Sequence, residues 1–281
     1  MKPGHESQTA VMVCAARAAA HGRTDVAAFS DPIAIELLPE DARQRVEQFR
    51  AGVQAKRLRE RIQRVVLEKR TKMMVPRTVA IDGAIRDAAS PQVVILGAGL
   101  DGRAWRMAEL AEVTVFEVDH PDSQREKQSR VASLKQAARD VRFVPVDFTR
   151  DRLEDALADA GHSPESQTTW VWEGVVMYLE RTKIEATLRV VAERSAPGSR
   201  LVVLYTSPSI IRQMVGFLLR LVGEPFLSAF TAEEMRTLLA GFGFTVVQDD
   251  DLARIATSLS AEFADASVFL KDMRIVTAQR R

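Results

Sequence analysis

A glycine-rich stretch and the acidic residues that follow it are the parts of this sequence whose types and spacing could do chemistry. Gly97, Gly99 and Gly102 come directly after an apolar run and fit the pattern G-x-G-x-x-G. Asp119 lies 22 residues after Gly97, at the end of the next such run, where an acid can accept hydrogen bonds from a ribose. This spacing is typical of a site for a nucleotide-containing cofactor, and an NAD(P)-dependent oxidoreductase is one interpretation of it.

The residue at position 101 argues against a dinucleotide. Asp101 places a negative charge where a pyrophosphate would approach a helix N-terminus, and the backbone N–H groups there favour an incoming anion only if no carboxylate opposes it. S-adenosylmethionine carries an ammonium, a sulfonium and a carboxylate, so a loop of mixed charge suits it better. It also needs an acid for its ribose diol.

Further acids close the next two apolar runs. Asp147 is followed by the apolar ring of Phe148, and Glu173 precedes Gly174. Either Asp119 or Asp147 alone could be a helix N-cap. Together with Glu173 they predict one crevice, because the carboxyl ends of neighbouring parallel strands meet at the same edge of an open sheet.

The elements that must position these residues begin at Pro91, where short β-branched runs start to alternate with helical patterns. Such alternation predicts an α/β fold with a parallel sheet covered by helices on both faces. The predicted parallel strands are Gln92–Gly97, Val113–Asp119, Val141–Asp147, Thr169–Val175 and Leu201–Thr206. Two later runs, Thr245–Asp250 and Val268–Ala278, follow a helix at Ala232–Gly241 and predict an antiparallel pair at one edge.

Two other regions complete the predicted architecture, a single domain over residues 1–281. Residues 1–90 are expected to form a helical N-terminal extension, and residues 91–281 the Rossmann-like core. The predicted N-terminal helices are Thr9–His21, one that begins at Asp31-Pro32, the basic segment described next, and Val79–Ala88. The apolar segment Ser207–Phe230 is either a core helix or a cap over the carboxyl end of the sheet.

The basic segment covers residues 43–77, which contain twelve Lys and Arg against three Glu, although the whole chain has a net charge of only +1. Apolar residues recur there at near-helical spacing: Val46, Phe49, Val53, Leu58, Ile62 and Val65. This pattern predicts an amphipathic helix with a solvated charged face, and an electrostatic role toward an anionic partner is the alternative. Phe49 is the only aromatic residue of the segment, so we expect no base stacking and no nucleic-acid partner.

Composition limits the class of protein and its expected location. Hydrophobic residues make up 46% and charged residues 27% of the 281 residues, as in ordinary globular proteins. The single cysteine, Cys14, cannot form an internal disulfide, and no apolar run reaches the length of a membrane span. The histidines His5, His21 and His162 are isolated, so we expect no metal site, and we expect a cytoplasmic location.

Four strings of the sequence resemble the leucine carboxyl methyltransferase-like family of S-adenosylmethionine-dependent O-methyltransferases. The strings are Ile95–Arg106, Glu117–Pro121, Val146–Phe148 and Glu173–Leu179. The family includes carboxyl methyltransferases of protein phosphatases and of polyketide pathways, and actinobacterial proteins of unassigned substrate. Shorter matches cover the N-terminal and cap segments: Ser7–Ala10, Arg17-Ala18, Asp31-Pro32 and Gly223–Phe226. Two departures, Gly102 for a usual threonine and Phe148 for a usual leucine, are compatible with the pattern.

The resemblance implies a class I methyltransferase fold with S-adenosyl-L-methionine as cofactor and roles for individual residues. The residues that it assigns to the cofactor site are Arg77, Gly97, Ala98, Gly99, Asp119, His120, Asp147, Phe148 and Glu173. Gly97 and its neighbours would hold the methionine moiety, Asp119 the ribose, Asp147 with Phe148 the adenine, and Glu173 the far wall. An arginine ahead of the first strand would bind the cofactor carboxylate, but positions 70, 72 and 77 are all basic, and which one does so is left open.

The acceptor is expected to be a small apolar or polyketide-type carboxylic acid. A carboxylate is already ionised at neutral pH, so its methylation needs orientation behind the methyl group and no general base. This agrees with the lack of a convincing catalytic constellation in the sequence, although His120 beside Asp119 could serve as a base. Tyr178 and Tyr205 are candidates for positioning the acceptor. A protein that binds the cofactor without turnover is a further alternative.

Overall fold

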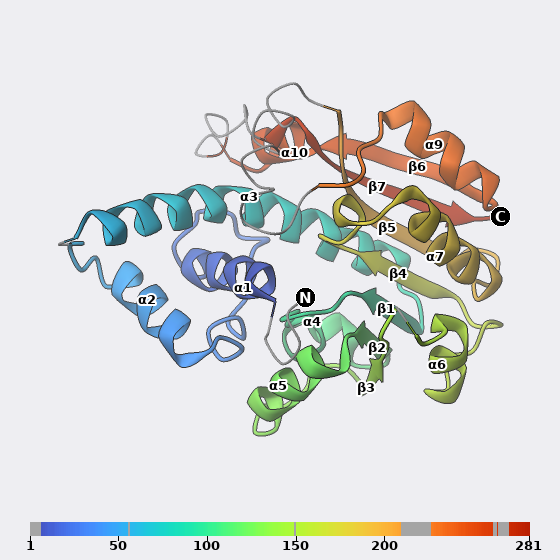
Figure 1. Ribbon diagram of the computed structural model, residues 1–281, viewed down its shortest axis with the longest axis horizontal. Helices are drawn as coiled ribbons and strands as arrows, with labels where there is room; N and C mark the ends of the chain where they lie inside the picture. Colours follow the sequence, from blue (N-terminus) through green and yellow to red (C-terminus); the bar gives the residue numbers. More distant parts are fainter. Residues whose placement is uncertain (1–6, 56, 149, 209–225, 261–262, 264–269) are drawn as a thin grey trace.

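A seven-stranded sheet forms the centre of the molecule, in the order β3-β2-β1-β4-β5-β7-β6 (Figure 1). The computed structural model describes residues 7–55, 57–148, 150–208, 226–260, 263 and 270–281. The strands are β1 (Gln92–Leu96), β2 (Thr114–Asp119), β3 (Asp140–Pro145), β4 (Thr168–Trp172), β5 (Arg200–Thr206), β6 (Phe244–Asp251) and β7 (Met273–Arg280). β1 to β5 are parallel, and β7 is antiparallel to both β5 and β6. The predicted mostly parallel sheet with one antiparallel edge is confirmed.

Helices cover both faces of this sheet. They are α1 (Gln8–Ala20), α2 (Glu40–Arg50), α3 (Leu58–Ala88), α4 (Arg103–Arg106), α5 (Pro121–Val131), α6 (Leu153–Asp159), α7 (Arg181–Glu193), α9 (Ala232–Gly241) and α10 (Leu252–Leu259), with 3₁₀ turns η1 (Ala108–Leu110) and η2 (Val176–Tyr178). Successive strand residues point to opposite faces. In β1, Val93 and Ile95 pack on the side of α1, α3 and α10, and Val94 and Leu96 on the side of α6, α7 and α9.

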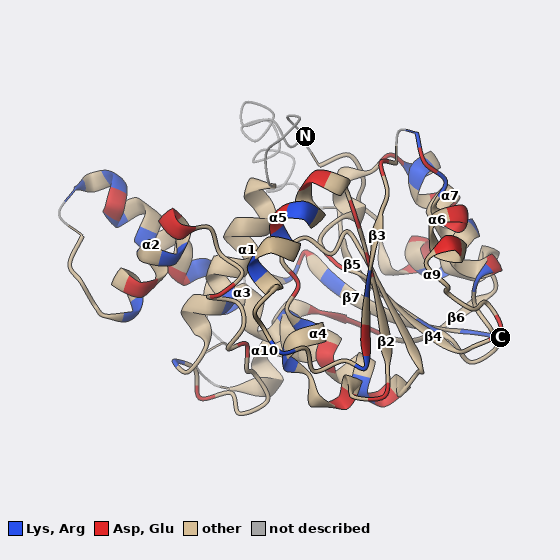
Figure 2. Ribbon diagram, turned by 90° about the horizontal axis from the view of Figure 1, so that it is seen from below, with Lys and Arg blue, Asp and Glu red and all other residues tan. Residues whose placement is uncertain are grey.

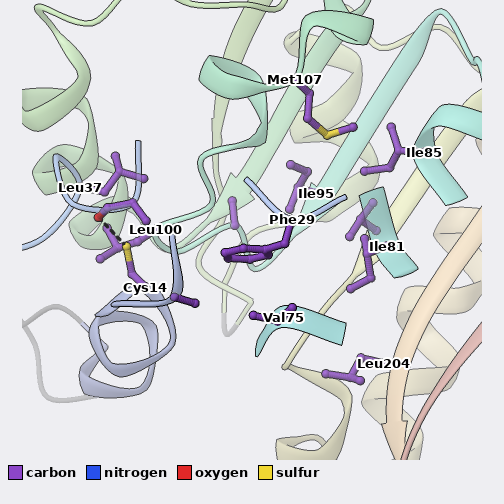
Figure 3. Close-up of a cluster of buried hydrophobic side chains, with 14 of the residues drawn as sticks. Cys14, Phe29, Leu37, Val75, Ile81, Ile85, Ile95, Leu100, Met107 and Leu204 are labelled. Atoms are coloured by element: carbon purple, nitrogen blue, oxygen red, sulfur yellow. Dashed lines mark hydrogen bonds between the residues drawn. The ribbon is translucent and has the colours of Figure 1, made fainter. Parts of the chain in front are cut away.

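The N-terminal helices share one apolar core with the sheet. Figure 3 shows Val75, Ile81 and Ile85 of α3 near Ile95 of β1. Cys14 in α1, the single cysteine of the chain, is buried, and its thiol donates a hydrogen bond to the carbonyl of Ala34 at 3.1 Å. The helical extension is therefore packed against the sheet face that carries Val93 and Ile95.

The predicted helix at Asp31-Pro32 is wrong. Residues 32–37 form successive turns, with Glu36 N–H donating to the carbonyl of Ile33 at 2.9 Å. Asp31 does accept a capping bond from the N–H of Ala34, but Pro39 follows a few residues later and disfavours helical backbone before it. The segment is too short to propagate a helix between these two signals.

The basic segment is two helices where one was predicted. Gly52 ends α2 in the left-handed conformation, with φ of 71°, which is a common helix terminator. Val46 is buried, as expected, but Leu58 is 74% and Ile62 55% exposed, so the predicted apolar face does not meet the core at the start of α3. Val53 and Val65 are likewise exposed. Figure 2 shows the charged residues of α2 and of this part of α3 to one side of the sheet.

The remaining boundaries agree with the sequence within a few residues. The helix Ala232–Gly241 is confirmed, and so is the antiparallel pairing of the last two strands. β7 begins at Met273, five residues later than predicted. Residues 209–225, most of the predicted cap or core helix, lie outside the described residues, and its end at Phe230 is buried and bonded through its N–H to Thr206.

Candidate functional site

The glycine loop connects β1 to α4 at the carboxyl edge of the sheet. The N–H groups of Gly97 and Ala98 both donate to the carbonyl of Val118 in β2, at 2.8 and 3.0 Å. Gly97 has φ of 71°, and a Cβ there would lie 2.5 Å from Cγ2 of Val175. A side chain at this position would therefore clash as well as strain the backbone, and only glycine lets the chain turn so closely past the end of β4.

Asp119 faces this loop from the end of β2. Its Oδ2 accepts a hydrogen bond from the N–H of Gly99 at 2.5 Å, and its Oδ1 accepts from the N–H of His120 at 2.6 Å. Burial raises the pKa of Asp119 above its ordinary value, although these two N–H groups oppose that shift. A carboxylate can accept about four hydrogen bonds, so Asp119 has acceptor positions left for further donors.

His120 has a structural task. Its Nδ1 accepts a hydrogen bond from the N–H of Asp122 at 3.2 Å and thereby caps the N-terminus of α5. Pro121 stands in the first turn, where a missing N–H costs nothing. The structure thus places His120 beside Asp119 but uses one ring nitrogen for the helix.

Glu173 follows β4 and is fixed by two arginines. Its Oε1 accepts from Nε of Arg77 in α3, and its Oε2 accepts from Nη1 of Arg103 in α4 at 2.8 Å. Burial alone would raise the pKa of Glu173, but Arg77 and Arg103 outweigh it and hold the pKa well below its usual range. Glu173 is therefore a permanent anion that links α3 to the glycine loop.

Glu173 belongs to a larger buried cluster, which we call the Arg103 network. Its members are four arginines and four acids: Arg17, Arg77, Arg103, Arg106, Asp31, Asp82, Asp101 and Glu173. Arg103 lies at its centre and binds Asp82, Asp101 and Glu173. The charges balance, which is what allows so many ionised groups to be buried together.

The Arg103 network also ties the helical extension to the glycine loop. Nη2 of Arg17 in α1 donates to the carbonyl of Leu100 at 2.6 Å, and its Nε binds Asp31 at 2.8 Å. Asp82 of α3 accepts from Nε of Arg103 at 2.7 Å and from Nη1 of Arg106 at 2.6 Å. None of Arg17, Asp82, Arg103 and Arg106 was predicted as a site residue.

Asp147 and Phe148 lie just beyond β3, at the more exposed side of the same edge. Asp147 forms an ion pair with Arg150 at 2.9 Å, and its N–H donates to Asp151 at 2.8 Å. The ring of Phe148 is 50% exposed. These interactions place Asp147 in a turn ahead of α6, whose N-cap is Arg152, so Asp147 is not the N-cap of that helix, while Phe148 presents an uncovered apolar surface.

The two predicted acceptor-positioning tyrosines have different surroundings. Tyr205 is fully buried, on the face of β5 covered by α7 and α9, and its hydroxyl contacts Asp249 at 2.8 Å and Arg274 at 3.0 Å. Its phenol is therefore used within the antiparallel edge, and we do not retain it as a site residue. Tyr178 is half-buried in η2 and stacks on Phe226, with ring centroids 5.4 Å apart.

The structure separates the three basic residues of α3. Arg77 is buried against Glu173, and a Cβ on Gly174 would come within 2.9 Å of its Nη2. Lys72 lines a small cavity of about 120 Å³ between α1 and α3. Arg70 is half-buried and interacts electrostatically with Tyr178. Arg77 alone of the three is in contact with a predicted cofactor-site residue in the described part of the chain.

The described residues contain neither a metal-binding cluster nor a candidate membrane-spanning helix. Among them, no group of three or more His, Cys, Asp and Glu side chains is arranged to hold a metal ion. Nor does any described helix combine the length and the apolar character that a membrane span requires.

Known proteins match this chain in sequence. Residues 10–192 match the family model of leucine carboxyl methyltransferase. A protein of Mycobacterium sp. (strain JLS), provisionally named an S-adenosyl-L-methionine-dependent methyltransferase, is 34% identical over 69% of this chain and 64% of its own length. A Streptomyces coelicolor protein with the same provisional name is 35% identical over half of each chain. The chain thus spans half to two thirds of these relatives.

Solved structures share the fold. A duf574 family protein from Streptomyces avermitilis has a TM-score of 0.61 at 14% identity, and 98% of each chain is covered. A provisionally named methyltransferase from Thermobifida fusca has a TM-score of 0.55 at 14% identity, covering 95% of this chain and 94% of its own. The family match confirms the resemblance predicted from the four strings and, with it, S-adenosylmethionine as the cofactor. The chain belongs to the leucine carboxyl methyltransferase family of S-adenosylmethionine-dependent methyltransferases.

Proposed function

We propose that this protein is an O-methyltransferase that converts the carboxylate of a small apolar acid, such as a polyketide-type acid, into its methyl ester. The observation that carries the proposal is the state of Glu173. Both of its oxygens are occupied by arginine donors and its pKa is held far below neutral, so it is unsuited to take a proton from an acceptor. A carboxylic acid acceptor needs no such base because it is ionised already.

The residues around the glycine loop fit the cofactor. Asp119 has acceptor positions left for two ribose hydroxyls, and its partial burial favours neutral donors of this kind. Gly97 to Gly99 and Arg77 would hold the methionine end, and Glu173 the far wall. Asp147 with the exposed ring of Phe148 would hold the adenine, and His120 fixes the loop beside the ribose site. When bound, the cofactor supplies an electrophilic methyl group on a sulfonium.

The chain's own contribution is then orientation and charge. Burial acts to raise the pKa of Asp101, but Arg103 outweighs it and keeps the pKa below its ordinary value, so Asp101 stays ionised within the charge-balanced network. The acceptor must be held in line with the methyl group, which can lower a barrier by several kcal/mol. Tyr178, five residues after Glu173, is our candidate for that positioning. We further propose that residues 1–281 act as one domain, because Arg17 and Asp82 bond to the loop region.

Binding of S-adenosylhomocysteine tests the cofactor site. Each charge-assisted hydrogen bond is worth about 1.5–3 kcal/mol, so Asp119→Ala should weaken binding at least tenfold in isothermal titration calorimetry. Asp140→Ala is the matched control, because Asp140 begins β3 at the opposite edge and pairs with Arg142. Equal affinities of the two variants would show that Asp119 only stabilises the glycine loop and does not bind the cofactor. Tight binding of NADH would favour the oxidoreductase.

Product analysis tests the reaction. Incubation with S-adenosylmethionine and a panel of apolar carboxylic acids should release methyl esters, which mild alkali hydrolyses. An alkali-stable aryl methyl ether would contradict carboxyl methylation. Cofactor binding without methyl release from any acid or phenol would favour the non-catalytic binder.

A further inference from the structure

The first turns of α3 expose an apolar surface to solvent. Leu58 is 74%, Ile62 55% and Val65 51% exposed, and Val66 is 41% exposed. Around a helix of about 3.6 residues per turn, these positions fall within an arc of about 100°. Leu67 lies on the opposite side of the same helix, where it packs against the buried apolar core. Leu58, Ile62, Val65 and Val66 therefore form one outward surface, which we call the outer α3 stripe.

Basic residues flank the outer α3 stripe. Helical spacing places Arg59 at one border of the stripe and Arg61 at the other, and it places Lys69 in line with Val65, one turn further on. Arg59, Arg61 and Lys69 are all exposed. A helix with an apolar side between cationic borders is typical of segments that lie at the interface between water and a lipid layer.

The two acidic residues of this part of α3 are used elsewhere. Glu60 accepts a hydrogen bond from the backbone N–H of Arg57 at 3.1 Å and so belongs to the N-terminal cap of the helix. Glu68 lines the small cavity between α1 and α3. The outer α3 stripe and its borders thus combine aliphatic side chains with positive charge.

The outer α3 stripe lies at one end of the molecule. Figure 1 shows the end of α2 and the start of α3 at one end of the long axis, away from the sheet. The glycine loop, in contrast, lies at the carboxyl edge of the sheet between β1 and α4. The stripe is therefore separate from the candidate cofactor site.

Charge complementarity distinguishes between the partners that could cover such a surface. A symmetric pair of copies brings equivalent residues together, so Arg59 and Arg61 would face like charges. A nucleic acid would neutralise the arginines, but it would leave the aliphatic side chains without the apolar contacts that they need. A lipid layer with anionic headgroups meets both requirements, because it offers negative charge beside an apolar interior.

We propose that the outer α3 stripe binds the surface of a membrane that contains anionic lipids. Leu58, Ile62 and Val65 would enter the boundary between headgroups and acyl chains, while Arg59 and Arg61 stay among the headgroups. The helix would then lie in the plane of the interface and would not span the bilayer. This inference goes beyond the proposed function and does not depend on the methyl acceptor.

Co-sedimentation of the full chain with lipid vesicles tests the proposal. Vesicles of phosphatidylcholine with about 30% phosphatidylglycerol should bind the wild-type protein about tenfold more tightly, or better, than vesicles of phosphatidylcholine alone. Binding to the anionic vesicles should weaken as the salt concentration rises, because salt screens the exposed charges.

A pair of double variants tests the basic borders. Arg59→Gln combined with Arg61→Gln should weaken binding to the anionic vesicles about tenfold. Lys183→Gln combined with Arg189→Gln is the matched control, because it removes the same charge from exposed positions of α7. The control should change vesicle binding by less than about twofold.

A pair of single variants tests the apolar residues. Ile62→Gln should weaken vesicle binding about threefold or more, because it replaces a side chain that enters the interface by a polar one. Val247→Gln, at a 52% exposed position of β6, should leave vesicle binding unchanged. All four variants should keep the wild-type midpoint of urea unfolding, since each changes only exposed side chains.

Several results would overturn the inference. They are equal binding to the two kinds of vesicle, no sedimentation with either kind, and wild-type binding by the Arg59/Arg61 or the Ile62 variant. A dimer in sedimentation equilibrium that Ile62→Gln dissociates would assign the outer α3 stripe to a second copy of the chain. Binding to mixed-sequence DNA or RNA that is tighter than binding to the anionic vesicles would assign it to nucleic acid.

Discussion

Two buried glutamates of this core, Glu173 and Glu117, show opposite protonation behaviour. Burial acts to raise the pKa of both. In Glu173 the arginines Arg77 and Arg103 reverse that effect and lower the pKa well below its usual range. In Glu117, which is 0% exposed, the pKa rises to about 7 although Nζ of Lys127 lies 2.6 Å from its Oε2.

The difference between the two acids lies in their donors. Each oxygen of Glu173 accepts from an arginine, whereas Oε1 of Glu117 has no hydrogen-bond partner in the described structure. The single cation of the pair is also shared, since Lys127 lies 5.1 Å from the ring centroid of Trp105 and acts on Asp101 as well. The number of donors, more than burial itself, decides whether a buried acid here is fixed as an anion.

The largest expected effect comes from breaking the Arg103 network. Asp82→Ala removes the acceptor of three hydrogen bonds and leaves the buried guanidiniums of Arg103 and Arg106 undercompensated. We expect a loss of about 3–5 kcal/mol in the free energy of unfolding, measured by urea denaturation. Asp87→Ala, an exposed position on the same helix, should change it by less than about 0.5 kcal/mol. Similar losses in both variants would contradict the role of the network.

The next effect is a pH dependence from Glu117. Because its pKa in the folded protein is about 7, above the ordinary value of 4.5, the folded state binds the proton more strongly than the unfolded state. Its contribution to stability is full below pH 4.5 and is lost as the pH rises toward 7 and beyond. The component is at most about 3 kcal/mol, and Glu117→Gln should lack it. A wild-type curve parallel to that of Glu117→Gln would show that Glu117 stays ionised.

A smaller loss in the free energy of unfolding is expected when the Glu117–Lys127 ion pair loses its cation. Lys127→Met removes the ammonium, but Glu117 can then take up a proton instead of remaining as a buried charge. We expect a cost of about 2 kcal/mol at pH 6, growing with pH, and below that of Asp82→Ala. Lys135→Met, at an exposed position, controls for the loss of a lysine. A pH-independent cost as large as that of Asp82→Ala would show that the Glu117–Lys127 pair behaves like the Arg103 network and would contradict this comparison.

Local sequence patterns were sufficient to predict most of the fold. The alternation of β-branched runs predicted the seven strands most directly where a strand is a short, continuous buried run, as in β1 and β4, whereas β3 and β6 are mostly half-buried or exposed. The pattern could not show that the start of α3 projects past the core, and so the exposed Leu58 and Ile62 were expected inside. Tyr205 faces α7 and α9 because it shares a face with Leu201 and Val203, and strand periodicity does not reveal which layer that face meets.

Local spacing predicted the candidate-site residues near the glycine loop. It did not predict the contacts between residues that are distant in the sequence. Gly97 and Asp119 follow from strand ends and glycine spacing. The Arg103 network joins residues as far apart in the sequence as Arg77 and Glu173, and no local spacing encodes such pairs. One signal was present: Arg17 stands in an alanine-rich helix, where an isolated charge indicates a buried partner.

The smallest expected effect on stability concerns His120, which follows β2 at the carboxyl edge of the sheet. Its ring is partly exposed and accepts the N–H of Asp122, so its measurable role is the N-cap of α5.

His120→Asn keeps an acceptor at that point and should change stability by less than about 0.5 kcal/mol, whereas His120→Ala should cost about 1 kcal/mol. If the acceptor is a carboxylate, methyl transfer should stay within a few-fold of wild type in both variants and remain nearly flat from about pH 6 to 8, because carboxyl groups ionise well below that range. A rate that rises tenfold per pH unit and collapses equally in His120→Asn and His120→Ala would identify His120 as a general base. The acceptor would then be a hydroxyl group, since a carboxylate has no proton to give up at that pH.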